Sequence, residues 1–259
     1  MSPTTTDRTR QAAVVLTALA FVISSQIATL TGTGRTIESQ SDISANSLVP
    51  PGFAFAIWGV IFAGMLAYAA TQALRHNATR RVFRETGWWL AAAMALSTAW
   101  ALAASYAPLE LSNWLTALIF VPFVLAALVA MRRATALRET EDGWTRFVAW
   151  VGPSLLAGWV ALAVFLNWEQ VLVGQLGLPA LPTALGLLAA ALLWIAGTLW
   201  ASDGNPLYAL PSIWGLGLLA WERLGDGSDP IGLSAAAGAL AIAAVALFAR
   251  RYGPPLTAR

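Results

Sequence analysis

Tryptophan is the residue type in this chain with the clearest potential for chemistry. The sequence holds 13 tryptophans. Five of them lie well inside long runs without charged residues: Trp58, Trp100, Trp159, Trp194 and Trp214. An indole ring in such a place offers a flat apolar face, and its N–H needs an acceptor. These five residues therefore predict either hydrogen-bonded packing between helices or an aromatic pocket for a flat apolar ligand.

Few polar residues accompany these tryptophans. We expect Gln26 and Asn167 to be buried and to form hydrogen bonds between helices, and Asn167 is also a candidate ligand contact. Glu169 and Asp203 fall at the ends of apolar runs, where we expect solvated side chains. Because no carboxylate lies at the centre of such a run, ion transport through buried carboxylates finds little support.

Several kinds of chemistry are excluded by composition. The chain has no cysteine and one histidine, His76, and all 15 of its basic residues are arginine. Disulfides, thiolate or multi-histidine metal sites, and a lysine Schiff base are therefore ruled out. We expect His76, beside Arg75, to be a solvated loop residue. We attribute the pI near 9.5 to arginine in loops, so we expect no nucleic-acid partner.

The elements that carry these residues are long apolar runs. With 58% hydrophobic and 11% charged residues, the chain lies outside the range of soluble domains. Runs of about 20 apolar residues are long enough to cross a bilayer, and continuous rather than alternating hydrophobicity favours helices over a barrel. We predict an all-α, polytopic transmembrane bundle of about eight helices without a soluble domain. The charge-free windows that could form these helices are 11–34, 53–74, 86–109, 111–131, 147–168, 170–202, 204–221 and 230–249.

The first window has an alternative interpretation as a cleaved signal peptide. Arg8 and Arg10 precede it, as in a signal peptide. Its apolar stretch is about 20 residues long, and no A-x-A cleavage site is evident, which favours a retained helix.

Arginine placement predicts the orientation of the bundle. In an eight-helix arrangement, all arginines except Arg35 and Arg223 fall on one side of the membrane. This pattern predicts that both termini are cytoplasmic. An odd number of helices would break the agreement, so the pattern favours eight helices over seven.

Three motifs, taken in order, resemble those of a known family. They are PPGFAFAIWGVIFAGMLAYA from Pro50 to Ala69, ALSTAW from Ala95 to Trp100, and PSLLAGWVALAVFLNW from Pro153 to Trp168. The chain resembles the tryptophan-rich sensory proteins, bacterial relatives of the mitochondrial translocator protein (peripheral benzodiazepine receptor). The resemblance covers residues 11–170, and the third motif is closer to a longer subgroup. Phe53 and Ser97 stand where short members often carry Trp and Asn.

The resemblance implies an architecture and a ligand site. It implies a five-helix bundle over residues 11–173 followed by three additional transmembrane helices over 181–250, in a bacterial inner membrane, with a homodimer as an assembly to test. Short members bind tetrapyrroles, sterols and synthetic aromatic ligands between their helices. The corresponding pocket here would be lined by Pro51, Phe53, Phe55, Trp58, Ser97, Trp100, Trp159 and Asn167. From the residues alone, Pro50 and Pro51 more simply begin the second helix.

These observations lead to three functional hypotheses. The first is a membrane ligand-binding or sensory protein for a tetrapyrrole or similar hydrophobic aromatic molecule, with porphyrin or haem as ligand and no required cofactor. The second is a carrier or permease for a small apolar solute, suggested by the three extra helices. The third is an enzyme acting on the bound ligand, for instance in light-dependent porphyrin breakdown. It is the least supported, because the sequence shows no acid/base constellation.

Overall fold

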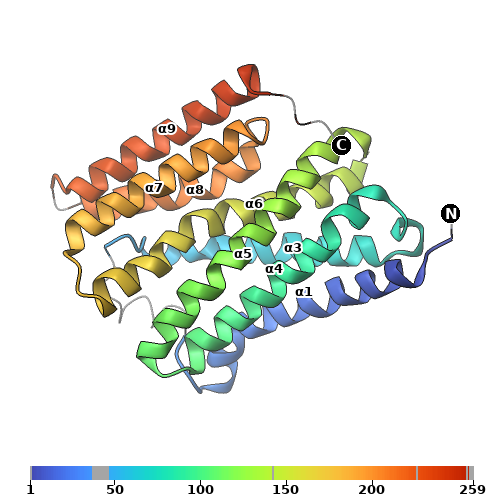
Figure 1. Cartoon of the computed structure of the whole chain (residues 1–259), viewed down its shortest axis with the longest axis horizontal. Helices are drawn as coiled ribbons and strands as arrows, with labels where there is room; N and C mark the ends of the chain where they lie inside the picture. Colours follow the sequence, from blue (N-terminus) through green and yellow to red (C-terminus); the bar gives the residue numbers. More distant parts are fainter. Residues whose placement is uncertain (1, 37–46, 142, 226, 255, 257–259) are drawn as a thin grey trace.

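The computed structural model describes residues 2–36, 47–141, 143–225, 227–254 and 256, which form eight α-helices joined by short connections (Figure 1). The helices are α1 (Thr5–Thr31), α3 (Ile57–Ala73), α4 (Arg81–Tyr106), α5 (Leu109–Leu137), α6 (Gly143–Glu169), α7 (Ala180–Trp200), α8 (Pro206–Leu224) and α9 (Pro230–Tyr252). The same residues include the 3₁₀ turns η1 (Gly52–Ala56), η2 (Arg75–Asn77) and η3 (Arg138–Thr140), and the π-helical turn η4 (Gln170–Gln175). The predicted all-α bundle of about eight helices is confirmed.

Most of these helices suit a lipid bilayer. Among the described residues, seven helices are long and apolar enough to cross a membrane. The exception, α8, carries Glu222 and Arg223 in its last turn, but its 19 residues reach about 28 Å, close to the roughly 30 Å of a hydrocarbon core. On the outer surface, Leu193 and Leu240 are 76% and 74% exposed, as expected for side chains facing lipid. The chain is a multi-pass membrane protein.

The helices pack as a ring of five with three more on one side (Figure 1). In the ring, α1 contacts α3, α3 contacts α6, α6 contacts α5, α5 contacts α4, and α4 returns to α1. The remaining helices join the ring through α6, which contacts both α7 and α8, while α9 packs against α7 and α8. Helix α6 is thus the central element of the molecule.

One expectation about helix boundaries was wrong. Arg8 and Arg10 lie inside α1, and Arg132 lies inside α5, rather than in loops. A helix continues past the last apolar residue because the long arginine stem can run along an apolar surface to a polar partner. The charge-free run 170–202 holds a π-helical turn and a connection before α7 starts at Ala180.

Ion pairs hold together one end of the bundle, which we call the arginine-rich end. The pairs are Arg84–Asp7 at 2.6 Å, Arg80–Glu141 at 2.7 Å and Arg138–Asp203 at 2.7 Å. They join the start of α1 to the start of α4, the α3–α4 connection to the α5–α6 connection, and the α5–α6 connection to the α7–α8 connection. The start of α1 and the end of α9 also lie toward this end (Figure 1).

The two arginines outside this pattern have local partners at the opposite end. Arg35 donates hydrogen bonds to the carbonyl oxygens of Ala104 and Ala107, at 2.9 and 2.5 Å, where α4 ends. Arg223 donates to the carbonyl oxygen of Ser47 at 2.6 Å. Both arginines therefore anchor connections on their own side of the bundle.

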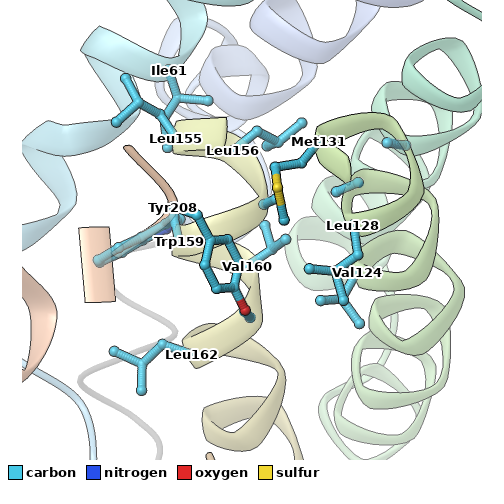
Figure 2. Close-up of a cluster of buried hydrophobic side chains, with 14 of the residues drawn as sticks. Ile61, Val124, Leu128, Met131, Leu155, Leu156, Trp159, Val160, Leu162 and Tyr208 are labelled. Carbon is cyan, nitrogen blue, oxygen red and sulfur yellow. The ribbon is translucent and has the colours of Figure 1, made fainter. Parts of the chain in front are cut away.

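The buried core surrounds α6. Figure 2 shows Met131, Val124 and Leu128 of α5 on one side of α6, with Trp159 and Leu162 directed away from them. Helix α8 approaches closely because position 158 is glycine: a Cβ there would collide with the carbonyl oxygen of Tyr208. This close packing fixes Trp159 between the five-helix ring and α8.

Candidate functional site

The chain before α3 directs two phenylalanines in different directions. Pro51 precedes η1, and the Ala54 N–H donates to the Pro51 carbonyl oxygen at 2.8 Å. This tight turn leaves Phe53 51% exposed, whereas Phe55 is half-buried and packs on the core. The prolines therefore begin a 3₁₀ turn, and the regular helix starts only at Ile57.

Aromatic rings converge where η1, α3 and α6 meet. The ring of Trp159 is 5.9 Å from that of Phe55 and 6.3 Å from that of Trp58, both edge to face. Trp58 also stacks on Phe62 at 5.6 Å. Edge-to-face and offset contacts of this kind stabilise aromatic clusters beyond the area they bury. The cluster holds the Trp58 and Trp159 rings at a defined angle.

Two amides contribute polar groups beside these rings. The Trp100 indole N–H donates to Asn167 Oδ1 at 2.9 Å, and Asn167 Nδ2 donates to the Ala163 carbonyl oxygen at 2.9 Å. Gln170 lies one turn further along, and its Oε1 is buried with no hydrogen-bond partner among the described residues. A buried acceptor without a partner is costly, so Gln170 can accept a hydrogen bond from a molecule bound beside it.

These groups line a hollow of about 560 Å³, which we call the tryptophan hollow. The lining residues are Val49, Phe55, Trp58, Trp100, Phe120, Trp159, Ala163, Leu166, Asn167 and Gln170. The surface is thus largely aromatic and aliphatic, with the two amides as its polar groups.

Five of the eight predicted site residues line the tryptophan hollow: Phe55, Trp58, Trp100, Trp159 and Asn167. The other three, Pro51, Phe53 and Ser97, do not line it. Phe53 packs its ring on Trp214 and Trp221 of α8, at 6.5 and 5.6 Å. Ser97 is buried within α4. The resemblance grouped Phe53 with Phe55, but it does not tell which side of a 3₁₀ turn each residue occupies.

Of the five mid-run tryptophans, Trp194 and Trp214 lie away from the tryptophan hollow. Trp194 is 39% exposed on α7, and Trp214 donates its indole N–H to the Ala54 carbonyl oxygen at 3.0 Å. The expectation that Gln26 is buried was wrong, because it is exposed and its amide donates to the neighbouring Ser25 at 3.3 Å. Gln26 lies at an open hollow between α1 and the start of α3, which Phe55, Trp58 and Phe62 also line.

Glu169 differs most from its expected role. We expected a solvated carboxylate, but Glu169 is fully buried. Its two carboxylate oxygens accept hydrogen bonds from the backbone N–H groups of Ser47 and Leu48, at 2.9 and 3.0 Å. Arg223 donates to the carbonyl oxygen of Ser47. Glu169 and Arg223 together hold residues 47–50, which we call the 47–50 segment, across the tryptophan hollow. Sequence could not reveal this contact, because its partners are backbone groups more than a hundred residues away.

Two further hollows adjoin the first. One, of about 490 Å³, lies toward α1 and shares Phe55 and Trp58 with the tryptophan hollow. The other, of about 470 Å³, lies toward α7 and α8 and shares Phe55 and Trp159. Phe55 therefore stands where all three meet. Among the described residues, no three His, Cys, Asp or Glu side chains gather as a metal site would require.

Fold and site together define a class: a multi-pass helical membrane protein with an aromatic hollow inside its bundle. A family model described as TSPO-like protein matches residues 11–248. The chain belongs to this family, which confirms its resemblance to the tryptophan-rich sensory and translocator proteins. No curated protein and no solved structure matches the chain.

The family match extends across all eight helices, from the second turn of α1 into α9. The division into a five-helix bundle over 11–173 and three additional helices over 181–250 stays a prediction. In the structure these two parts share one continuous core, with α6 between them.

Proposed function

We propose that this membrane protein binds a flat, hydrophobic aromatic molecule of the tetrapyrrole class in the tryptophan hollow. The observation that carries the proposal is the unpaired Oε1 of Gln170 beside the rings of Trp58, Trp100 and Trp159. A planar ligand would place its face or edge against the indoles, and its pyrrole N–H would donate to Gln170. Lipid tails offer no such donor, which supports an aromatic ligand carrying N–H groups rather than a trapped lipid.

Titration of the purified protein with protoporphyrin tests the proposal. Binding is followed by the absorbance and emission of the porphyrin, so that loss of a tryptophan does not distort the signal. Trp58→Ala and Trp159→Ala are each expected to weaken binding about tenfold, because each removes an aromatic contact worth on the order of 1.4 kcal/mol.

The matched control is Trp194→Ala, which removes an exposed tryptophan from α7 and is expected to leave the affinity unchanged. Binding that does not saturate in the wild-type protein would contradict the proposal. So would equal affinity in the wild-type protein, Trp58→Ala and Trp159→Ala.

The arrangement of charges supports a location in a bacterial inner membrane with both termini in the cytoplasm. Cytoplasmic loops of membrane proteins carry an excess of arginine and lysine. Here the arginine-rich end contains the start of α1 and the end of α9, with Arg250 and Arg251 in its last turn. Homodimer formation stays a prediction, which chemical cross-linking in membranes would test.

The alternative functions stay predictions. Transport of a small apolar solute would require flux in proteoliposomes above that of empty liposomes. Catalysis on the bound ligand would need groups that transfer protons or electrons. In the part of the chain that the structure describes, the tryptophan hollow has no acid/base pair in its lining. Binding is therefore the function that the site supports best.

A further inference from the structure

The hollow toward α7 and α8, which we call the apolar hollow, is lined without a polar side chain. Its outer wall comes from the last part of the chain: Leu188 and Ala191 on α7, and Gly215, Leu216 and Leu219 on α8. A charged or amide-bearing group placed there would lose its hydrogen bonds to water, at a cost of several kcal/mol. The apolar hollow therefore accepts only aliphatic or aromatic hydrocarbon.

This hollow adjoins the tryptophan hollow. Phe55 and Trp159 line both, and so do Ala163 and Leu166 of α6. A molecule that extends past the edge of the Trp159 ring would therefore pass from a space with two amides into one with hydrocarbon walls. This polarity difference suits an amphiphile with an aromatic head and an apolar tail.

Gly215 allows α8 to lie close to the side chains that line the apolar hollow. A Cβ at this position would lie 2.9 Å from Leu162 Cδ2 and 3.3 Å from Trp159 Cζ3. The Leu162 branch and the Trp159 ring would have to shift; both line the apolar hollow, and Trp159 also lines the tryptophan hollow. A glycine on α8 thus allows Trp159 and Leu162 to lie close against that helix.

We propose that the apolar hollow is a second subsite, which holds the aliphatic tail of a ligand whose aromatic head occupies the tryptophan hollow. The proposal rests on the proposed function and extends it by naming a tailed amphiphile as the ligand class. It also assigns a role to α7 and α8: they close a tail site that a five-helix ring alone would leave open to lipid.

The free energy that the tail gains on entering this hollow is smaller than the free energy of its transfer from water into an apolar site. Before binding it lies in lipid or detergent, which is as apolar as the hollow, so the gain comes from close packing. Affinity should therefore rise with tail length by less than about fourfold per methylene, the figure for transfer from water. The rise should stop once the tail exceeds the length of the hollow.

A series of porphyrin diesters tests this subsite. The probes are protoporphyrin diesters with one methyl ester and one linear alkyl ester, from methyl to dodecyl, so that charge is constant across the series. We expect a severalfold rise in affinity through the shorter tails, followed by a plateau or a fall. Equal affinity for all lengths, with saturable binding of the dimethyl ester, would overturn the subsite and leave the proposed function intact.

A cavity-filling variant provides a second test of the subsite. Ala191→Phe places a ring in the apolar hollow and should abolish the dependence on tail length while leaving the dimethyl ester affinity unchanged. The control, Ala190→Phe, adds the same ring to the adjacent, exposed position of α7 and should retain the wild-type dependence. Equal weakening of all probes by Ala191→Phe would overturn the subsite. If Ala191→Phe fails to fold, the series of tail lengths on the wild-type protein still tests whether the subsite exists. If the dimethyl ester does not saturate, the proposed function fails and the subsite fails with it.

Discussion

Trp100 and Asn167 form the polar contact that orients the inner wall of the tryptophan hollow. The Asn167 amide joins two elements, because its Oδ1 accepts from an indole on α4 while its Nδ2 donates within α6. The Trp100 ring also meets Phe120 of α5 edge to face at 5.6 Å. A single amide thus holds a tryptophan of α4 against two other helices of the ring, α5 and α6, and leaves the Gln170 Oε1 as an acceptor without a partner among the described residues.

At this residue scale, we predict that Asn167→Leu and Trp100→Phe each weaken porphyrin binding, and that the double variant binds little worse than either one. Each substitution breaks the same hydrogen bond, which is worth on the order of 1 kcal/mol between membrane helices. The measurement is a double-mutant cycle on the porphyrin dissociation constant. Additive losses in the double variant would contradict the assignment of a shared contact.

The 47–50 segment shows how separate elements close the site. Its backbone has no helix or strand partner, so its polar groups need other acceptors and donors. Glu169 at the end of α6 supplies two acceptor oxygens, and Arg223 near the end of α8 supplies a donor. The segment in turn places Leu48 and Pro50 over the apolar hollow and Val49 over the tryptophan hollow.

At the element scale, we predict that Glu169→Ala loosens this segment. It leaves two backbone N–H groups without acceptors, at about 1–3 kcal/mol each if they stay buried. The chain has no cysteine, so a single Ser47→Cys reports on the segment. Its reaction with a polar maleimide should be faster in the Glu169→Ala background.

The control for this experiment is Ser228→Cys, an exposed position in the α8–α9 connection. Its labelling rate should be the same with and without Glu169→Ala. Unchanged labelling at position 47 would mean that other contacts hold the segment in place.

The whole molecule is a five-helix ring extended on one side by three helices through α6. Because the described residues form an even number of helices, the start of α1 and the end of α9 fall at the same end, together with the ion pairs Arg84–Asp7 and Arg138–Asp203. The opposite end carries the 47–50 segment, so the aromatic site opens away from the arginine-rich end. Charge and site therefore mark different faces of the membrane.

At this scale, we predict opposite sidedness for His76, in the α3–α4 connection, and Ser228. In intact cells, a membrane-impermeant maleimide should label Ser228→Cys, whereas His76→Cys should react only after permeabilisation. The physical reason is that the arginine-rich end stays on the cytoplasmic side during insertion. Labelling of both positions from outside, or of His76→Cys alone, would refute the proposed orientation.

The sequence by itself determined the eight helices, their order and the arginine-rich end. Bilayer thickness sets the length of an apolar run and arginine sets its ends, and both properties are local. Trp58, Trp100, Trp159 and Asn167 could be selected for the same reason: an indole or amide inside an apolar run stands out without any knowledge of its neighbours.

Only the tertiary structure decided which of these residues meet. It separated Phe55 from Phe53, placed Trp194 and Trp214 outside the tryptophan hollow, and buried Glu169 against the backbone of residues 47 and 48. Within a bilayer every surface of a helix can be apolar, so hydrophobicity no longer tells the packed face from the lipid face. That choice depends on close contacts, such as the approach of α8 to Gly158, which form between residues far apart in the chain.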